Sequence, residues 1–155
     1  MVDSHLSPFS REGDEVPMRV LVVDDNEHNR LVMQAILPSL GCTMTSVASG
    51  EEAAELARVA AFDLVVMDLH MPGIGGDEAA WRIRNDGPSR SAFIVRWSTD
   101  MPARLDLGLY DGELPKPLRC AALEDVVGEA RRRMLNRADE GSRFTAARGR
   151  PHARR

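Results

Sequence analysis

Lysine is almost missing from this 155-residue chain, because nineteen of its twenty basic side chains are arginine. The single lysine is Lys116, in the stretch Leu114-Pro115-Lys116-Pro117-Leu118. Lysine carries a compact ammonium with three donors, whereas arginine is a wide planar fork. One ammonium on a stiff proline-flanked turn predicts a small anionic site. Chance in an arginine-rich composition is an equal alternative at this point.

Cysteine and long apolar runs are also scarce. Cys42 and Cys120 have no metal-ligand spacing, and two cysteines do not make a disulfide scaffold, so we interpret both as reduced packing residues. No apolar run is long enough to span a membrane, and no signal-peptide pattern opens the chain. We therefore expect a cytoplasmic protein without membrane contact.

The length favours one domain without a fused output domain. Residues 1–17 mix Ser, Pro, Gly and charge and are interpreted as a flexible leader, and the domain is expected over 18–135. The charge is uneven, because residues 131–155 carry nine arginines and two acids, a net +7, on an acidic body. We predict that 136–155 is a basic disordered tail, and this composition favours a solubilising role over nucleic-acid binding.

Short apolar runs alternate with helical patterns along the domain. Three runs are continuous, as in strands buried on both faces of a parallel sheet, and Cys42–Val47 alternates like an edge strand. The continuous runs are Val20–Val23, Leu64–Met67 and Phe93–Val95. Helical apolar spacing occurs over Val32–Leu40, Ala53–Ala60, Ala79–Ile83 and Leu123–Met134. A proline at position 38 should shorten the first helix. The alternation predicts an open α/β sheet with helices on both faces.

Polar residues follow each apolar run. Because ligands bind at the carboxyl ends of strands in such sheets, these residues are expected to gather at one edge. The continuous runs are followed by Asp24 and Asp25, by Asp68, and by Ser98 and Thr99, and the last strand is followed by Lys116.

Three carboxylates in one cleft repel one another by roughly 3 kcal/mol per pair at ~5 Å and a dielectric near 20. A hard divalent cation with oxygen ligands removes that repulsion, and Mg²⁺ is typically held by carboxylates and a phosphate. Together with Lys116 it would surround a phosphoryl group with positive charge, to which Ser98 adds a hydroxyl donor. Asp68 stands alone at a strand end and is the candidate phosphoryl acceptor.

With these motifs the chain resembles the response-regulator receiver domain of two-component signalling, over about residues 18–134. The matching motifs are Val22-Val23-Asp24-Asp25-Asn26, Val65-Val66-Met67-Asp68-Leu69-His70-Met71-Pro72-Gly73 and Leu114-Pro115-Lys116-Pro117. The stretch from Asp24 to Val32 is similar to receivers associated with hybrid sensor kinases. The resemblance implies a flavodoxin-like fold with five parallel strands in the order 2-1-3-4-5.

The resemblance also implies a role for each matching residue. Asp68 would be the phosphoacceptor, Asp25 a direct Mg²⁺ ligand and Asp24 a ligand through water. The backbone carbonyl of His70 would complete the protein ligands, and Ser98 and Lys116 would hold phosphoryl oxygens. A cis bond before Pro117 is implied as well.

The implied reaction is transfer from a phosphohistidine, on a sensor histidine kinase or a histidine-phosphotransfer protein, onto Asp68. The domain would catalyse this transfer and its own dephosphorylation, without turnover of small molecules. Such a chain would relay the phosphoryl group or switch a protein partner downstream, whose identity the sequence does not give.

The second half of the domain departs from the family pattern. Only 18 positions separate Ser98 from Lys116, so the fourth helix is expected to be short or irregular. Arg96 and Trp97 interrupt an apolar strand, and we expect Arg96 to reach solvent or to pair with an acid. Glu113 stands where typical receivers have an aromatic residue that moves inward on phosphorylation. We therefore predict ordinary acceptor chemistry with unusual output coupling.

Two alternatives remain at the level of the sequence. A haloacid-dehalogenase-type phosphatase also uses Asp, Ser or Thr, Lys and Mg²⁺, but its first strand carries an Asp-x-Asp pattern, whereas His70 stands two residues after Asp68 here. A pseudo-receiver or docking adaptor would act through shape alone. We interpret both Trp81 and Trp97 as packing residues.

Overall fold

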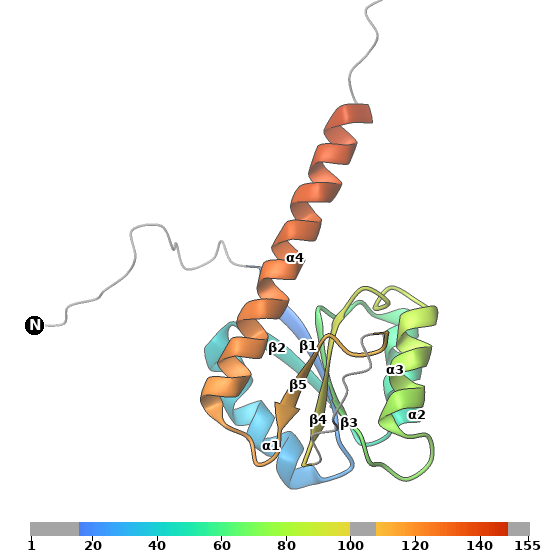
Figure 1. The fold of residues 1–155 in the computed structure, drawn as a ribbon, viewed down its shortest axis with the longest axis vertical. Helices are drawn as coiled ribbons and strands as arrows, with labels where there is room; N and C mark the ends of the chain where they lie inside the picture. The colour runs from blue at the N-terminus through green and yellow to red at the C-terminus, as the bar shows by residue number, and fades with distance from the viewer. Residues whose placement is uncertain (1–15, 100–107, 149–155) are drawn as a thin grey trace, which may run out of the picture.

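Helices enclose a five-stranded parallel sheet in the computed structural model, which describes residues 16–99 and 108–148, without the side chains of residues 144–148 (Figure 1). The strands are β1 Met18–Val23, β2 Cys42–Val47, β3 Leu64–Asp68, β4 Phe93–Ser98 and β5 Gly112–Pro115. The helices are α1 Glu27–Ile36, η1 Leu37–Leu40, α2 Gly50–Val59, α3 Gly76–Asn85 and α4 Cys120–Arg148, of which η1 is a 3₁₀ helix. The sheet order is β2-β1-β3-β4-β5, which confirms the predicted fold.

Local sequence accounts for the ends of the helices. The side chain of Ser49 accepts a hydrogen bond from the Glu52 amide at 3.2 Å and caps α2. Pro38 cannot continue the α-helical hydrogen-bond ladder, so α1 ends at Ile36 and the chain tightens into η1. Gly41 then ends η1 in the left-handed conformation, with φ of 75°.

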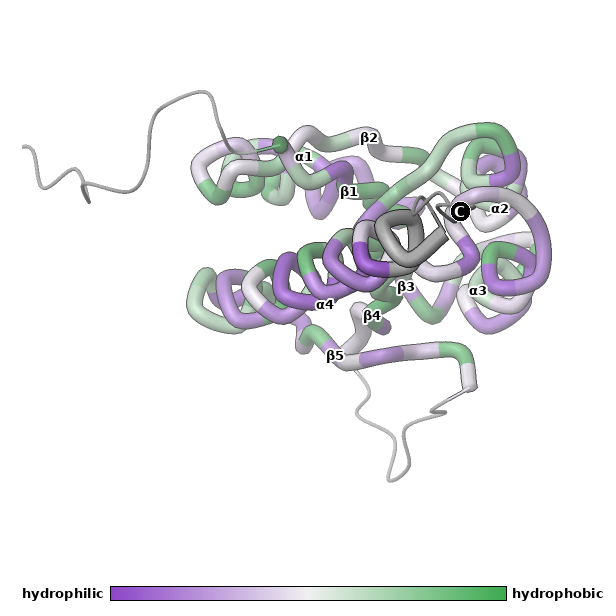
Figure 2. Tube along the Cα trace, turned by 90° about the horizontal axis from the view of Figure 1, so that it is seen from above, coloured by the Kyte–Doolittle hydropathy of each residue, from purple (hydrophilic) through white to green (hydrophobic). Residues whose placement is uncertain are grey.

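The two faces of the sheet carry separate apolar clusters. Seen from above, α1 and α4 lie on one side of the sheet, and α2 and α3 lie on the other (Figure 2). Residues alternate between the faces along each strand. Val95 and Trp97 of β4 therefore pack with α1 and α4, whereas Ile94 packs with α2 and α3.

Trp81 corrects one interpretation made from the sequence. Trp97 is 1% exposed and packs as expected, but Trp81 is 57% exposed. Ala79, Ala80 and Ile83 turn the buried stripe of α3 towards the sheet, and at 100° per residue this places Trp81 on the opposite side of the helix.

The final helix continues beyond the predicted end of the domain. We expected a disordered tail from residue 136, but α4 runs to Arg148 and projects past the edge of the sheet opposite the strand carboxyl ends (Figure 1). The side chains of residues 135–143 are exposed, so tertiary packing does not hold this part. Ala, Leu, Arg and Glu are strong helix formers, and no proline interrupts them before Pro151.

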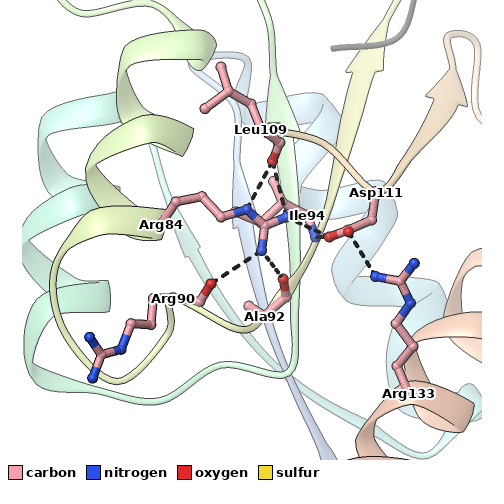
Figure 3. Close-up of polar contacts among 7 residues, drawn as sticks. All are labelled: Arg84, Arg90, Ala92, Ile94, Leu109, Asp111 and Arg133. Carbon is pink, nitrogen blue, oxygen red and sulfur yellow. Dashed lines mark hydrogen bonds and ion pairs between the residues drawn. The ribbon is translucent and has the colours of Figure 1, made fainter. Parts of the chain in front are cut away.

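Arg84, near the end of α3, fastens the chain that leads into β5 (Figure 3). Its guanidinium donates to the carbonyl oxygens of Ala92 at 2.7 Å and Leu109 at 3.1 Å, and to the carboxylate of Asp111 at 2.5 Å. The other oxygen of Asp111 accepts from Arg133 of α4 at 2.8 Å. Asp111 thus ties α3 to α4 around the edge of the sheet formed by β5.

Hydrogen bonds keep Asp111 ionised in this position. Burial opposes its charge, yet donors from the Ile94 amide and the Arg84 guanidinium outweigh burial and hold the pKa of Asp111 below its usual value. The short or irregular fourth helix predicted from the sequence falls on residues 100–107, which lie outside the described residues.

Candidate functional site

Strand register brings the predicted residues to one edge of the sheet. Val23 pairs with Met67, Asp68 with Trp97, and Ser98 with Pro115, so β1, β3, β4 and β5 end side by side. The residues that follow these ends therefore enclose one cleft. It has a volume of about 240 Å³ and is lined by Asp24, Asp25, Asn26, Asn29, Asp68, His70, Ser98, Thr99 and Lys116.

Asp24 lies fully buried between β1 and α1. One carboxylate oxygen accepts from the backbone amide of Asn26 at 2.9 Å, and the other accepts from the side-chain amide of Asn29 at 3.0 Å. Asn26 is also the N-cap of α1, because its side chain accepts from the Asn29 amide. The start of α1 thus fixes Asp24, while the neighbouring Asp25 is exposed at the rim.

Asp68 ends β3 and is 5% exposed. One of its oxygens accepts a hydrogen bond from the His70 amide at 3.4 Å. Burial raises the pKa of Asp68 to about 6, the charge of Asp24 adds to the increase, and Lys116 opposes it. Burial and the negative charge of Asp24 therefore both oppose ionisation of Asp68.

Three carboxylates meet in this cleft. Oxygens of Asp24, Asp25 and Asp68 lie within 4.8 Å of one another, a spacing at which one ion can contact all three. A donor set made only of oxygen fits a hard cation such as Mg²⁺. The repulsion anticipated from the sequence is therefore present in the fold.

Lys116 supplies positive charge to the same cleft. Its Nζ lies 2.9 Å from Asp24 and 3.2 Å from Asp68, and its side chain is 16% exposed. The backbone amide of Lys116 donates to the Ser98 carbonyl at 3.0 Å, which joins the ends of β4 and β5. The bond before Pro117 is cis, as the resemblance implied.

The turn after Asp68 is packed closely against its surroundings. A side chain at Gly76 would bring a Cβ to within 2.3 Å of the Asp68 carbonyl oxygen, so only glycine lets α3 start here. Across the turn, Glu51 of α2 accepts from the Ile74 amide at 2.9 Å. This hydrogen bond lowers the pKa of Glu51. The turn that carries His70 is thus held from both sides.

Arg96 of β4 and Glu113 of β5, which both depart from the family pattern, contact each other. Arg96 stands beside Glu113 in the register, and its Nη2 donates to the Glu113 carboxylate at 2.6 Å. The side chains are 7% and 16% exposed, so the pair is largely desolvated. Of the two outcomes expected for Arg96, contact with solvent or pairing with an acid, the structure shows the second.

Tyr110 extends the pair towards α3. The guanidinium carbon of Arg96 lies 5.1 Å from the centre of the Tyr110 ring, and the Tyr110 hydroxyl donates to Asp77 at 2.7 Å. Tyr110 is 1% exposed and contributes to the apolar cluster beneath α2 and α3. Arg96, Tyr110 and Asp77 thus form a network of ionic, aromatic and hydrogen-bonding contacts beside Glu113.

Sequence reasoning missed several residues of the site. Asn26 and Asn29 contact Asp24, and the ring of Trp97 lies under the Lys116 ammonium, with Nζ 4.7 Å from the ring centre. An asparagine directly before a helical pattern is a capping signal and could have been used to find Asn26. The contact of Trp97 depends on strand register and has no local signal.

Comparison with known proteins agrees with the fold. The model of the response regulator receiver domain family matches residues 20–127. The chain is 47% identical over 125 residues to the virulence sensor protein BvgS of Bordetella pertussis, and 38% identical over 112 residues to the autoinducer 1 sensor kinase/phosphatase LuxN of Vibrio campbellii. These matches cover 75% and 70% of this chain but only 10% and 13% of those proteins.

Solved structures give the same result. The receiver domain of a sensor histidine kinase from Pseudomonas aeruginosa, which has a magnesium ion coordinated in its active-site cleft, is 28% identical with a TM-score of 0.67. The match covers 74% of this chain and 97% of that one. Within the described residues, no helix combines the length and apolar character needed to cross a membrane. The chain belongs to the response regulator receiver domain family of two-component signalling.

Proposed function

We propose that this receiver domain accepts a phosphoryl group from a phosphohistidine onto Asp68 in a Mg²⁺-dependent reaction, and then relays it or switches a protein partner. One observation carries the proposal. The Lys116 ammonium contacts both Asp68 and Asp24 inside the cleft where the third carboxylate, Asp25, also converges. A carboxylate nucleophile, a cation and an oxygen-ligand cluster at one point suit phosphoryl transfer.

The donor set fits a magnesium ion. Asp24, Asp25 and Asp68 would hold it together with the backbone carbonyl of His70, with Asp24 acting through water. When bound, the ion neutralises charge on the phosphoryl oxygens. Its charge would also lower the pKa of Asp68, against the burial that raises it.

The chain's own residues would then perform the transfer. A carboxylate oxygen of Asp68 attacks phosphorus, and the bond from phosphorus to the donor imidazole nitrogen breaks, with its electron pair passing to that nitrogen. Lys116 and the Ser98 hydroxyl hold two of the phosphoryl oxygens. Later a water molecule attacks the same phosphorus, the aspartyl phosphate bond breaks, and inorganic phosphate leaves.

The donor would be a sensor histidine kinase or a histidine-phosphotransfer protein, because the chain is similar to parts of sensor kinases such as BvgS and LuxN. We place the reaction in the cytoplasm, with a further protein as the downstream partner. We do not expect nucleic acid or a membrane to be a partner.

The same proposal includes unusual output coupling, because Glu113 stands in place of the usual aromatic residue. Glu113 is engaged by Arg96 at 2.6 Å, so it is already fixed by a charged partner. NMR spectra with and without beryllofluoride and Mg²⁺ test this. We expect the resonances of Arg96 and Glu113 to move little while those of Asp68 and Lys116 move strongly. Large shifts at Glu113, as in an ordinary receiver, would contradict the proposal.

Phosphoryl acceptance is tested by incubating the full chain with Mg²⁺ and phosphoramidate or acetyl phosphate. We expect the mass to increase by one phosphoryl group, in an adduct that survives acid and is lost in alkali. Asp68→Asn should abolish the adduct, whereas Asp63→Asn, at the opposite end of β3, should retain it. Absence of the adduct with every donor would favour a docking role through shape alone.

A further inference from the structure

Trp97 contacts Lys116, and the proposed phosphoryl transfer gives this contact no role. The Nζ of Lys116 lies 4.7 Å from the centre of the Trp97 ring. An ammonium within about 6 Å of an indole face is attracted by the negative charge density of the ring, and the attraction is stronger where water is excluded. Trp97 is 1% exposed, and the Lys116 side chain is 16% exposed, so water screens this contact poorly.

The fold fixes both partners of this contact. Trp97 pairs with Leu114 in the register of β4 and β5. The Lys116 amide donates a hydrogen bond to the carbonyl of Ser98, the residue after Trp97. The indole is packed in the apolar cluster beneath α1 and α4. Its Nε1 has no acceptor among the described residues. Apolar packing therefore holds the ring, and its face is the part that meets Lys116.

We propose that Trp97 is a positioning residue that keeps the Lys116 ammonium in the cleft during phosphoryl transfer, an inference that rests on the proposed function. Without a metal, Asp24 and Asp68 attract the ammonium. The same carboxylates would be the donors for Mg²⁺, so a bound ion would withdraw much of this attraction and add a repelling charge.

The lysine side chain is flexible and could then turn towards solvent. The Trp97 ring is uncharged and is not a metal ligand, so its attraction for the ammonium persists when the carboxylates are engaged. The ammonium thus stays where the phosphoryl oxygens arrive.

The sharpest test changes the charge density of the ring while nearly preserving its volume. In a Trp81→Phe background, Trp97 is the only tryptophan and can be replaced by mono-, di- and trifluorotryptophan, which weaken the attraction stepwise. With Mg²⁺ and phosphoramidate, we expect the rate of Asp68 labelling to fall with each fluorine, by about threefold to tenfold over the series. Equal rates across the series would overturn the proposal.

Substitutions separate positioning from packing. Trp97→Phe retains an aromatic face and should label within about threefold of the parent, whereas Trp97→Leu should lose about tenfold. Val95→Ala removes volume from the same apolar cluster and serves as the packing control. If Val95→Ala, at matched thermal stability, slows labelling as much as Trp97→Leu does, packing explains the effect and the proposal fails.

A second readout needs no phosphoryl donor. Lys116→Met should change the fluorescence of Trp97 in the Trp81→Phe protein, with and without Mg²⁺, because the ammonium no longer lies over the ring. Identical emission in the presence of Mg²⁺ would refute a retained contact. Absence of labelling in the parent would refute the proposed function and this role with it, whereas labelling without fluorine dependence would refute only the role of Trp97.

Discussion

Replacing Asp68 by asparagine should make the metal-free protein more stable at neutral pH, even though it removes the proposed acceptor. Burial and the charge of Asp24 raise the pKa of Asp68 from 3.8 to about 6. The folded protein therefore binds the Asp68 proton more tightly than the unfolded chain does. The free energy of unfolding is highest below pH 3.8, falls as the pH rises towards about 6, and is level above that with respect to this group.

The magnitude follows from the same shift. Each pKa unit corresponds to about 1.4 kcal/mol, so a rise from 3.8 to about 6 corresponds to about 3 kcal/mol. The side chain of Asp68 is 7% exposed, so water does little to reduce this value. Asparagine has nearly the shape of the neutral acid and avoids the penalty. Asp68→Asn should therefore gain up to about 3 kcal/mol at neutral pH and almost nothing in acid.

Urea unfolding of the two proteins in a metal chelator, from about pH 4 to about pH 8, measures this difference. Added Mg²⁺ should stabilise the native protein more than the variant, because it relieves repulsion that the variant has already lost. Asp63→Asn controls for a general effect of lost charge. Equal stability of native protein and Asp68→Asn at about pH 8, or a gain that is the same at about pH 4, would refute the reasoning.

Three further outcomes follow from charged side chains. Lys116→Arg should slow phosphoryl uptake at least tenfold in the phosphoramidate assay, because a planar guanidinium does not fit the ammonium site between the carboxylates; undiminished uptake would contradict this. Glu113→Ala should lower the free energy of unfolding by about 3 kcal/mol, because it leaves Arg96 buried without its acid, and Arg96→Met together with Glu113→Leu should largely restore it; an unchanged stability of Glu113→Ala would contradict this. Arg84→Lys should destabilise by about 2 kcal/mol in urea, against less than about 0.5 kcal/mol for the exposed control Arg82→Lys; similar values for both would argue against the Arg84 anchor.

The sequence was sufficient to predict the sheet and the group of residues at the carboxyl ends of its strands. Continuous apolar runs predict buried parallel strands, and polar residues after these runs and after the last strand must meet when the strands align. This reasoning placed Asp24, Asp68 and Lys116 together, and the structure brings them within hydrogen-bonding or ion-pair distance. The order of the motifs also disfavoured a phosphatase, in agreement with the family to which the chain belongs.

Contacts across the sheet could not be predicted in the same way. The pairing of Arg96 with Glu113 and the position of Trp97 under Lys116 depend on the register of β4 and β5, which no local pattern encodes. The continuation of α4 to Arg148 was missed for another reason. An arginine-rich composition was taken as a sign of disorder, although arginine and alanine have high helix propensity.

The ion pair of Arg96 and Glu113 bears on how the domain would pass on its signal. Separating a buried pair leaves an uncompensated charge, which costs about 3–5 kcal/mol, whereas coupling between two sites in a protein is typically about 1–3 kcal/mol. The coupling free energy that a change at Asp68 would supply is therefore smaller than the cost of separating Glu113 from Arg96. The contacts of Lys116 with Asp24 and Asp68 lie in the cleft where the phosphoryl group would arrive, so the ammonium would exchange one buried anionic partner for another without leaving a charge uncompensated. The structure thus favours a signal carried by Lys116 and the cleft itself over one carried by displacement of Glu113.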